Sequence, residues 1–292
     1  MKVLAGIVLY NPEPIRLKEN IDAIHQQVDT VLLIENGSTN KDYKVHLTGY
    51  DNILYIDNHA SMGIAYALNQ ICGYAYTHGY EWALTLDQDS VATPGMVDTY
   101  KGIAKDNIGI IGCYIEDRNY KEPNQERYEG TFGVPWVITS ASFTNVKAWK
   151  ECGGFDNEMF IDFVDTDICY SMRNAGYKIL ITFHTKLIHE LGINTTIKHI
   201  PLIKRIQVEN HNSVRKYYRE RNLIYLTRKY KDYSIISTLK TTLKDIAAVV
   251  LYERNKLPKL WAMAKGLCNG IFMKPKFEHI TQEFLSLEVE EL

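Results

Sequence analysis

The sequence predicts an α/β fold with a mainly parallel sheet and helices on both of its faces, followed by a helical C-terminal region. In the first 200 residues, short apolar runs alternate with longer amphipathic segments in units of ~25 residues, which is typical of strands joined by crossover helices. Polar residues follow several of these runs directly. From about Pro201, long helical patterns rich in Tyr, Lys and Arg replace the strands.

Five apolar runs in the first half of the chain are expected to be strands. They are Val3–Leu9, Thr30–Ile34, Ile53–Asp57, Trp82–Leu86 and Ile108–Cys113. A further apolar segment that contains Ser and Thr, Val134–Phe143, is also expected to be a strand. The polar segment Asp117–Gly130 is expected to be a loop.

Two amphipathic helices are expected between these strands. Isoleucines recur at roughly helical spacing in Pro14–Gln27, and the small or apolar residues of Gly63–His78 gather on one face. In sheets of this kind, ligands bind at the carboxyl ends of the strands. The polar residues that follow the strands are therefore the first candidates for chemistry: Asn11, Asn36, Asn58, Asp87, Gln88 and Asp89.

Length and composition indicate an ordinary globular protein. The chain has 292 residues, of which 46% are hydrophobic and 23% charged, which argues against disorder. Its five cysteines are an odd number without a CxxC pair, so a regular disulfide framework is excluded and a reducing, cytoplasmic compartment is favoured. We expect no secretory segment and no membrane span, because no apolar run approaches the ~18 residues that a span needs.

Charge is distributed unevenly along the chain. Residues 198–276 carry 18 Lys and Arg residues against 5 Asp and Glu residues, a net charge of +13, whereas residues 1–197 carry −10 and residues 277–292 carry −5. We therefore expect a domain at 1–200 and a basic helical region at 201–292 that packs on it. The basic region favours an anionic partner, such as membrane lipid, nucleic acid or a phosphorylated substrate, although a solvated helical surface has the same composition.

Asp87, Gln88 and Asp89 follow the expected strand Trp82–Leu86 directly. Two carboxylates at a strand end can hold a hard divalent cation together with phosphate oxygens. An exposed turn is the alternative, since Asp and Ser are turn formers.

Three carboxylates lie within residues 160–167, where a helical pattern begins. Asp162 at the N-cap and Asp165 at the third helical position would stabilise the helix end by themselves. A helix start also fixes a carboxylate and keeps it ionised, which suits a general base. The residues alone leave both interpretations open.

Two further candidates are weaker on their own. His189 follows an apolar run and can complete a metal site that a carboxylate begins, although a structural role is the commoner one. Asn58 to Asn69 contains Gly63 and several alanines, which allow a ligand to approach backbone N–H groups at a helix start. Close helix packing explains the same small residues.

In their order and spacing, these segments resemble the inverting GT-A glycosyltransferases of family 2, and within them the bacterial rhamnosyltransferases. The resemblance covers about residues 1–230. The matching segments are Ile7-Val8-Leu9-Tyr10-Asn11, Ile34-Glu35-Asn36-Gly37-Ser38, Asn58 to Asn69, Leu86-Asp87-Gln88-Asp89-Ser90, Thr139-Ser140, Gly153-Gly154-Phe155-Asp156, Phe160 to Asp167, Arg173 to Tyr177, His189-Glu190-Leu191-Gly192 and Arg215 to Asn222.

The resemblance implies how a nucleotide-sugar donor is bound. Residues at positions where the family holds the base and ribose are Tyr10, Asn11, Glu35 and Asn36. Residues on the family's nucleotide-binding helix start are Asn58, Gly63 and Ala67. Asp87 matches the carboxylate on the ribose and sugar side, and Gln88 lies beside it in the same donor-binding segment.

The resemblance also implies the metal ligands and the base. Asp89 matches the family's ligand for Mg²⁺ or Mn²⁺, and His189 matches its second protein ligand. Asp165 matches the catalytic base. Val164 replaces the Glu of most members, as in rhamnosyltransferase-like members, whereas Ala141 replaces a frequent Gly and leaves the acceptor-side loop less defined.

The function implied is a metal-dependent inverting transfer of L-rhamnose from dTDP-β-L-rhamnose to a surface polysaccharide on a lipid carrier. UDP-galactofuranose or a UDP-hexose is the alternative donor. A sugar nucleotidyltransferase or an inactive nucleotide-sugar-binding protein is a further alternative. We expect a cytoplasmic protein that associates peripherally with the inner face of the membrane, binds no nucleic acid and is able to form homo-oligomers.

Overall fold

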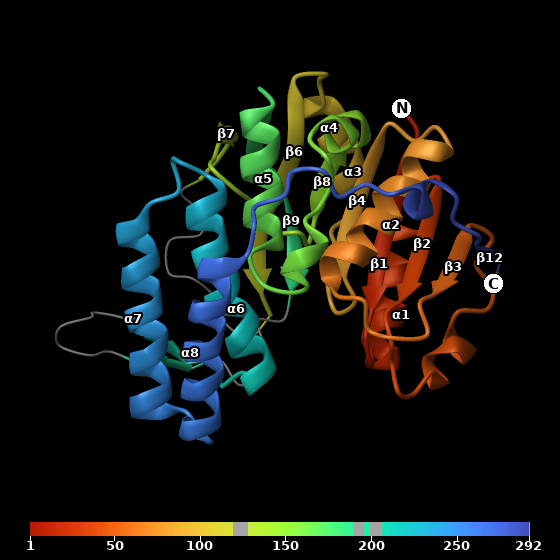
Figure 1. Cartoon of the computed structure of the whole chain (residues 1–292). Helices are drawn as coiled ribbons and strands as arrows, with labels where there is room; N and C mark the ends of the chain where they lie inside the picture. The colour runs from red at the N-terminus through yellow and green to blue at the C-terminus, as the bar shows by residue number, and fades with distance from the viewer. Residues whose placement is uncertain (119–127, 190–195, 199–205, 209, 292) are drawn as a thin grey trace. The chain divides into compact units, whose positions relative to one another are not determined.

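The computed structural model describes residues 1–118, 128–189, 196–198, 206–208 and 210–291 (Figure 1). Its contacts divide the chain into two compact units. Unit 1 comprises Met1–Phe160, Val164–Glu190 and Phe277–Leu292, and unit 2 comprises Ile161–Phe163 and Leu191–Lys276. These units differ from the expected regions 1–200 and 201–292 at the C-terminal end, where the chain returns to unit 1. The expected packing of one region on the other stays a prediction.

Unit 1 is built on a mixed sheet whose strand order, within the described residues, is β12-β3-β2-β1-β4-β8-β6-β9-β5. The half from β3 to β4 is parallel, β6 and β9 form a second parallel pair, and the antiparallel β8 joins the two. The strands are β1 (Val3–Leu9), β2 (Thr30–Glu35), β3 (Ile53–Asp57), β4 (Trp82–Asp87), β5 (Val91–Ala92), β6 (Ile108–Asp117), β7 (Thr131–Gly133), β8 (Ser142–Asn145), β9 (Lys178–His189) and β12 (Glu290–Glu291).

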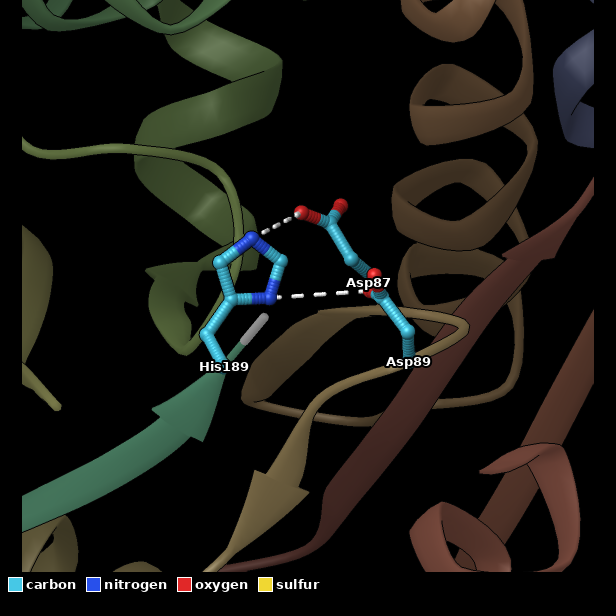
Figure 2. Close-up of side chains that lie close together, drawn as sticks. All are labelled: Asp87, Asp89 and His189. Carbon is cyan, nitrogen blue, oxygen red and sulfur yellow. Dashed lines mark ion pairs between the residues drawn. The ribbon is translucent and has the colours of Figure 1, made fainter. Parts of the chain in front are cut away.

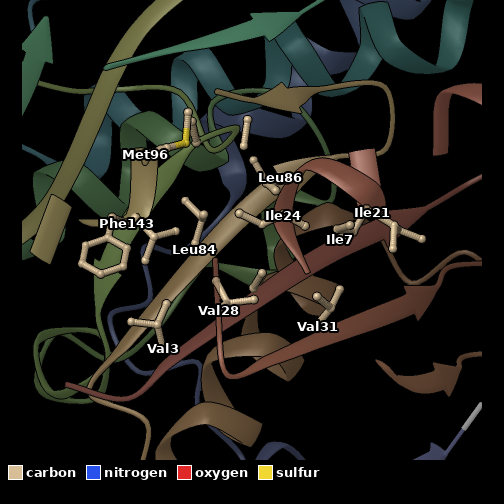
Figure 3. Packing of buried hydrophobic residues seen from close by; sticks show 14 of the residues in the cluster. Val3, Ile7, Ile21, Ile24, Val28, Val31, Leu84, Leu86, Met96 and Phe143 are labelled. Atoms are coloured by element: carbon tan, nitrogen blue, oxygen red, sulfur yellow. The ribbon is translucent and has the colours of Figure 1, made fainter. Parts of the chain in front are cut away.

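The α-helices of unit 1 cover both faces of this sheet, as the sequence predicts. They are α1 (Pro14–Ile24), α2 (Ile64–Thr77), α3 (Met96–Ile103), α4 (Val146–Glu151) and α5 (Val164–Asn174). On β1, Val3 and Ile7 join a buried cluster with Ile21 of α1 (Figure 3). Gly6 points to the opposite face, because neighbouring side chains alternate along a strand. There a Cβ would lie only 2.4 Å from Ile71, so the glycine admits α2 against β1.

Strand register brings the polar strand ends to one edge of the sheet. Val8 pairs with Asp87, and Leu9 pairs with Glu35, which in turn pairs with Asp57. The residues that follow β1, β2, β3 and β4 therefore emerge side by side, where α/β sheets bind their ligands.

The prediction of a strand over Val134–Phe143 is wrong for most of this segment. The strand β8 begins only at Ser142, and β7 ends before Val134. Pro135 has no N–H to donate to a ladder. Ala141 is buried with φ +59, a left-handed conformation that ends regular pairing, and its carbonyl accepts a hydrogen bond from the Tyr100 hydroxyl at 2.7 Å.

Unit 2 contains the hairpin β10 (Thr196–Lys198) and β11 (Ile206–Val208) and the helices α6 (Ser213–Lys229), α7 (Ile235–Tyr252) and α8 (Lys256–Phe272). The helix α8 packs closely on α6 through two glycines. A Cβ on Gly266 would lie 2.4 Å from the Tyr217 carbonyl oxygen, and one on Gly270 would lie 2.5 Å from that of Arg221. Larger residues at either position would push the two helices apart.

The contacts among α6, α7 and α8 are unusually polar. The buried Glu253 carboxylate pairs with both Lys216 and Lys259, at 2.7 and 2.8 Å. The Thr242 hydroxyl donates to the buried Glu220 carboxylate at 2.8 Å. Because taking charges out of water is costly, a buried ion pair adds little net stability, but removal of one partner leaves a buried charge uncompensated. In the part of the chain that the structure describes, no helix has the length and apolarity to span a bilayer.

The buried Glu220 predicts a pH-dependent stability. Burial, reinforced by the Asp245 charge, raises the pKa of Glu220 from 4.5 to about 7. The folded state therefore binds more protons than the unfolded state between these values, and the free energy of unfolding falls as the pH rises from 4.5 to 7. Glu220→Gln removes this loss and should stabilise the protein above pH 7 by up to about 3 kcal/mol.

Urea unfolding of the wild type and of Glu220→Gln at pH 5 and pH 8 measures this effect. The stabilisation should be largest at pH 8 and small at pH 5. The exposed Glu288→Gln serves as control and should change stability little at either pH. An equal effect of Glu220→Gln at both pH values would contradict the argument.

Candidate active site

Two aspartates lie at the carboxyl end of β4. Asp87 is the last residue of the strand, and its carbonyl accepts hydrogen bonds from the Ser90 N–H at 3.1 Å and from the buried Asn20 amide at 2.7 Å. These bonds hold the turn that carries Asp89. The Asp87 and Asp89 side chains remain 43% and 39% exposed, so both carboxylates can reach a ligand.

His189 is the last residue of β9 and faces both carboxylates (Figure 2). Its Nδ1 lies 3.5 Å from Oδ1 of Asp89, and its Nε2 lies 3.9 Å from Oδ2 of Asp87. One potential ligand atom from each residue lies within 4.8 Å of the others. The sequence analysis expected Asp89 and His189 to act together, and the structure brings Asp87 to the same group.

Two buried serines orient this group, and the sequence analysis assigned them no role. The Ser90 hydroxyl lies 3.0 Å from Nδ1 of His189 and 2.8 Å from the Ser140 hydroxyl, whose oxygen accepts the Asp87 N–H at 3.0 Å. This chain of hydrogen bonds links the imidazole to the backbone of β4 through the segment before β8. Both serines lie in segments that match the family, Leu86 to Ser90 and Thr139-Ser140. That match is the sequence signal that could have identified them.

Gln88 fixes the backbone of Tyr10 at the end of β1. Its carboxamide oxygen accepts the Tyr10 N–H at 2.8 Å, and its nitrogen donates to the Tyr10 carbonyl at 3.2 Å. The Tyr10 side chain is 54% exposed and available for stacking. Gln88 therefore serves the expected donor site through Tyr10, by joining the ends of β1 and β4.

Asn11 orders the turn after β2. Its backbone has φ +47, which Asn tolerates better than most residues. The Asn11 N–H donates to Ser38 Oγ at 2.7 Å, and Asn11 Oδ1 accepts from both the N–H and the hydroxyl of Thr39 at 2.9 Å. The residue thus ties the β1 and β2 ends into one surface.

Glu35 is fully buried, so its position favours an indirect role at the donor site. The Glu35 carboxylate accepts hydrogen bonds from the Ser38 N–H and from the Tyr43 hydroxyl. Burial and this carboxylate raise the pKa of Tyr43 well above its ordinary value, so the phenol stays a donor. Glu35 therefore supports the turn that follows β2.

Asn36 and Asn58 form a polar network under the start of α2. Asn36 Oδ1 accepts the Met62 N–H at 3.0 Å, and Asn36 Nδ2 donates to the Gly63 carbonyl at 3.3 Å. Asn58 and Gln70 exchange two side-chain hydrogen bonds, at 2.7 and 2.9 Å. The network holds the segment between β3 and α2 in one conformation.

Gly63 precedes α2 with φ +86, and a Cβ there would lie 2.8 Å from the Phe160 carbonyl oxygen. That oxygen accepts the Ile64 N–H at 2.6 Å, so the first donor of the helix is already used inside the protein. Ala67 is fully buried one turn into the helix. At these two positions the close packing that the sequence analysis left open is present.

Asp165 is the second residue of α5, and its Oδ1 accepts the Thr166 N–H at 2.7 Å. The N-cap position that one of the two interpretations gave to Asp162 is wrong, because α5 begins at Val164 and Asp162 has φ +63. Within unit 2, the Arg215 guanidinium donates to both Asp162 oxygens at 3.1 to 3.2 Å, and Asn222 donates to the Asp162 carbonyl at 3.0 Å. The Asp162 carboxylate is thus held in an ion pair with Arg215.

Comparisons with known proteins identify the family of the chain. The model of the family "Glycosyl transferase family 2" matches residues 5–171. The chain is 26% identical over 298 residues to the dTDP-rhamnosyl transferase RfbF of Shigella flexneri, covering 92% of this chain and 95% of that protein.

Solved structures share the fold at low sequence identity. The structure of GalNAc-T7 with UDP, GalNAc and Mn²⁺ is similar with a TM-score of 0.58 and 13% identity over 84% of this chain, which spans 54% of that one. S. aureus TarS residues 1–349 in complex with UDP gives a TM-score of 0.54 and 10% identity, over 91% of this chain and 71% of that one.

The fold is that of a GT-A glycosyltransferase. The chain belongs to glycosyl transferase family 2, since the family model matches more than half of its length. Within that family it is rhamnosyltransferase-like. The resemblance derived from the sequence, the fold class and the enzyme class are thereby confirmed.

The tight contact at Gly63 can be tested against Gly79, a second glycine with a positive φ. Gly63→Ala should lower the free energy of unfolding more than Gly79→Ala, because both have positive φ but only Gly63 has a backbone oxygen in the way. We expect a loss of about 1 kcal/mol at Gly79 and at least about 3 kcal/mol at Gly63. Urea unfolding measures both, and equal losses would contradict the close approach of Phe160.

Proposed function

We propose that the protein is a metal-dependent, inverting rhamnosyltransferase that uses dTDP-β-L-rhamnose. The observation that carries the proposal is the convergence of Asp87, Asp89 and His189 at the carboxyl end of the sheet, in a chain of glycosyl transferase family 2. The relative RfbF, which carries dTDP-rhamnosyl transfer in its name, supports this donor over UDP-galactofuranose or a UDP-hexose. Family membership also favours a transferase over a nucleotidyltransferase or an inactive binding protein.

The three side chains fit Mg²⁺ or Mn²⁺. Carboxylate oxygens are ligands that hard divalent cations prefer, and a neutral imidazole is a common nitrogen ligand. Asp89 and His189 would hold the ion, with Asp87 as a third ligand or as the carboxylate on the ribose and sugar side. When bound, the ion would neutralise charge on the diphosphate of the donor. Ser90, at Nδ1 of His189, would fix the orientation of the imidazole.

The nucleotide would lie over the ends of β1 and β2 and the start of α2. The exposed Tyr10 ring is suited to stack on a base. Asn11 and Asn36, supported by Glu35, would hold the backbone groups that contact base and ribose. Asn58, Gly63 and Ala67 would shape the wall at α2 without direct bonds to the donor.

Asp165 would act as the general base. Its position in the first turn of α5 places the carboxylate near the positive end of the helix dipole, which favours negative charge. The carboxylate would take the proton from the acceptor hydroxyl while that oxygen forms a bond to C1 of the sugar. The bond from C1 to the diphosphate breaks on the opposite face, so the configuration inverts and a nucleoside diphosphate leaves.

The acceptor would be a growing surface polysaccharide on a lipid diphosphate carrier. A cytoplasmic enzyme that reaches such an acceptor would work at the inner face of the membrane, and the basic composition of residues 198–276 supports this placement. Homo-oligomers are compatible with the proposal, and nucleic acid is not part of it.

A thermal-shift panel tests the donor and the metal together. dTDP-rhamnose should raise the melting temperature more than UDP-galactose or UDP-glucose, and Mn²⁺ should increase that shift. His189→Ala should abolish the Mn²⁺-dependent part and leave the shift in EDTA unchanged. A larger shift with a UDP-sugar would replace the donor, and full transferase activity in excess EDTA would reject the metal.

Asp165→Asn tests the base. Because Asn cannot accept the proton, transfer should fall by at least about 100-fold, while donor binding stays within a few-fold. Transfer assays and donor titrations measure the two effects, and Asp162→Asn serves as the matched variant in the neighbouring turn. Near wild-type kcat in Asp165→Asn, together with loss of transfer in Asp162→Asn, would move the assignment to Asp162.

A further inference from the structure

The helix α7 exposes several large apolar side chains and buries Thr238 and Thr242 besides Ala248 and Val249. Ile236, Leu239, Leu243 and Val250 are all exposed and follow one another at helical spacing on one face. Toward α6, by contrast, the helix presents Thr238 and Thr242, whose hydroxyls bond to Thr227 at 2.7 Å and to Glu220 at 2.8 Å. In the first half of α7, this is the reverse of the usual arrangement in a water-surrounded bundle.

The helix α8 repeats the inversion. Leu257 and Trp261 are 80% and 74% exposed, and the stripe continues through Ala264, Cys268 and Phe272 at spacings of three and four residues. Its buried positions, which contact α6 or its ion pairs, include Lys259, Gly266 and Gly270. Both apolar stripes therefore lie on helix faces turned away from α6.

Charge is sorted in the same way as polarity. Within residues 213–276, which the structure describes throughout, Glu220, Asp245 and Glu253 point into the bundle and Asp232 is the one exposed acid. The exposed cations are Arg228, Lys231, Lys240, Lys244, Arg254, Lys256, Lys265, Lys274 and Lys276. The exterior of these helices is thus apolar and almost purely cationic.

We propose that the outward faces of α7 and α8 form a docking surface for an anionic lipid bilayer. Exposed leucine, isoleucine and tryptophan side chains would enter the boundary between headgroups and acyl chains, as in interfacial helices. The cations would contact lipid phosphates and draw the protein to the surface. The helices would lie on the bilayer, and the buried polar contacts to α6 would stay inside the protein.

This occupant fits better than the alternatives. A second copy of the chain would bring two cationic surfaces together with almost no exposed acids to offset them. A nucleic acid would engage the cations but leave the apolar stripes in water. An anionic bilayer satisfies both features. The inference uses neither the donor, the metal nor the base, so it stands or falls apart from the proposed transferase reaction.

Vesicle binding tests the surface on the full chain. The protein should sediment with vesicles of phosphatidylcholine and phosphatidylglycerol at low salt, and much less at high salt or with phosphatidylcholine alone. Of the four tryptophans, Trp82 and Trp149 are buried, whereas Trp136 and Trp261 are exposed. The variant Trp136→Phe therefore leaves Trp261 as the exposed tryptophan. In that variant, anionic vesicles should shift the fluorescence emission to shorter wavelength.

The double variant Leu257→Ser/Trp261→Ser should lower the vesicle partition coefficient at least ~10-fold. Ile15→Ser, an exposed apolar residue of α1, serves as control and should leave it unchanged. Equal sedimentation with neutral and anionic vesicles, no sedimentation with either, or unchanged binding of the double variant would each overturn the proposal. Sedimentation velocity without lipid tests the remaining alternative, a dimer formed through this surface. If the wild type is a dimer and the double variant a monomer, the surface binds a second copy of the chain.

Discussion

The candidate active site depends on one short pairing between β5 and β9. Val91 pairs with Ile188, and Ala92 pairs with Leu187, in antiparallel register. Val91 follows Asp89 by two residues, and His189 follows Ile188 directly. Two ladder pairs therefore bring together side chains that are a hundred residues apart in the chain. The parallel pairing of Asp117 with His189 holds the same end of β9 from its other side.

The serines show why such a short pairing is sufficient. Ser90 belongs to the turn between Asp89 and β5, and Ser140 belongs to the segment that precedes β8. Both are buried, and their hydroxyls connect the imidazole of His189 to the backbone of Asp87. A rotation of the imidazole would break this chain of hydrogen bonds. The ring orientation is thus set before any ligand arrives, which is what a preorganised binding site requires.

Periodicity in the sequence predicts the central strands and the first helices well, because each is a local pattern of buried side chains. It fails for Val134–Phe143, where Val137 is buried without belonging to a strand and Trp136 is exposed. Ala141 adopts a left-handed conformation that no pattern of hydrophobicity signals. The meeting of Asp87 with His189 depends on long-range strand pairing, so the residues alone suggest each group separately. Only the family resemblance joined Asp89 and His189 in advance.

The helices α7 and α8 show a different limit of prediction from sequence. A helical stripe of leucines and isoleucines has the same period whether the stripe faces a core or the exterior. Sequence analysis recognised the net charge of +13 over residues 198–276, but not that the acids of α6 and α7 and Glu253 turn inward. The sorting of charge is visible only once the helices are packed.

The division of the chain into units has a consequence for how it can be cut. The backbone passes between the units four times, at 160/161, 163/164, 190/191 and 276/277, so unit 2 is an insertion rather than an appendage. A truncation near residue 200 would remove Phe277–Leu292 from unit 1. In unit 1, Gly73 makes room for the carbonyl group of Phe284, and Gly153 makes room for that of Phe277. The truncation would expose these two glycines to water. A minimal catalytic fragment would instead have to keep both termini and shorten the chain internally.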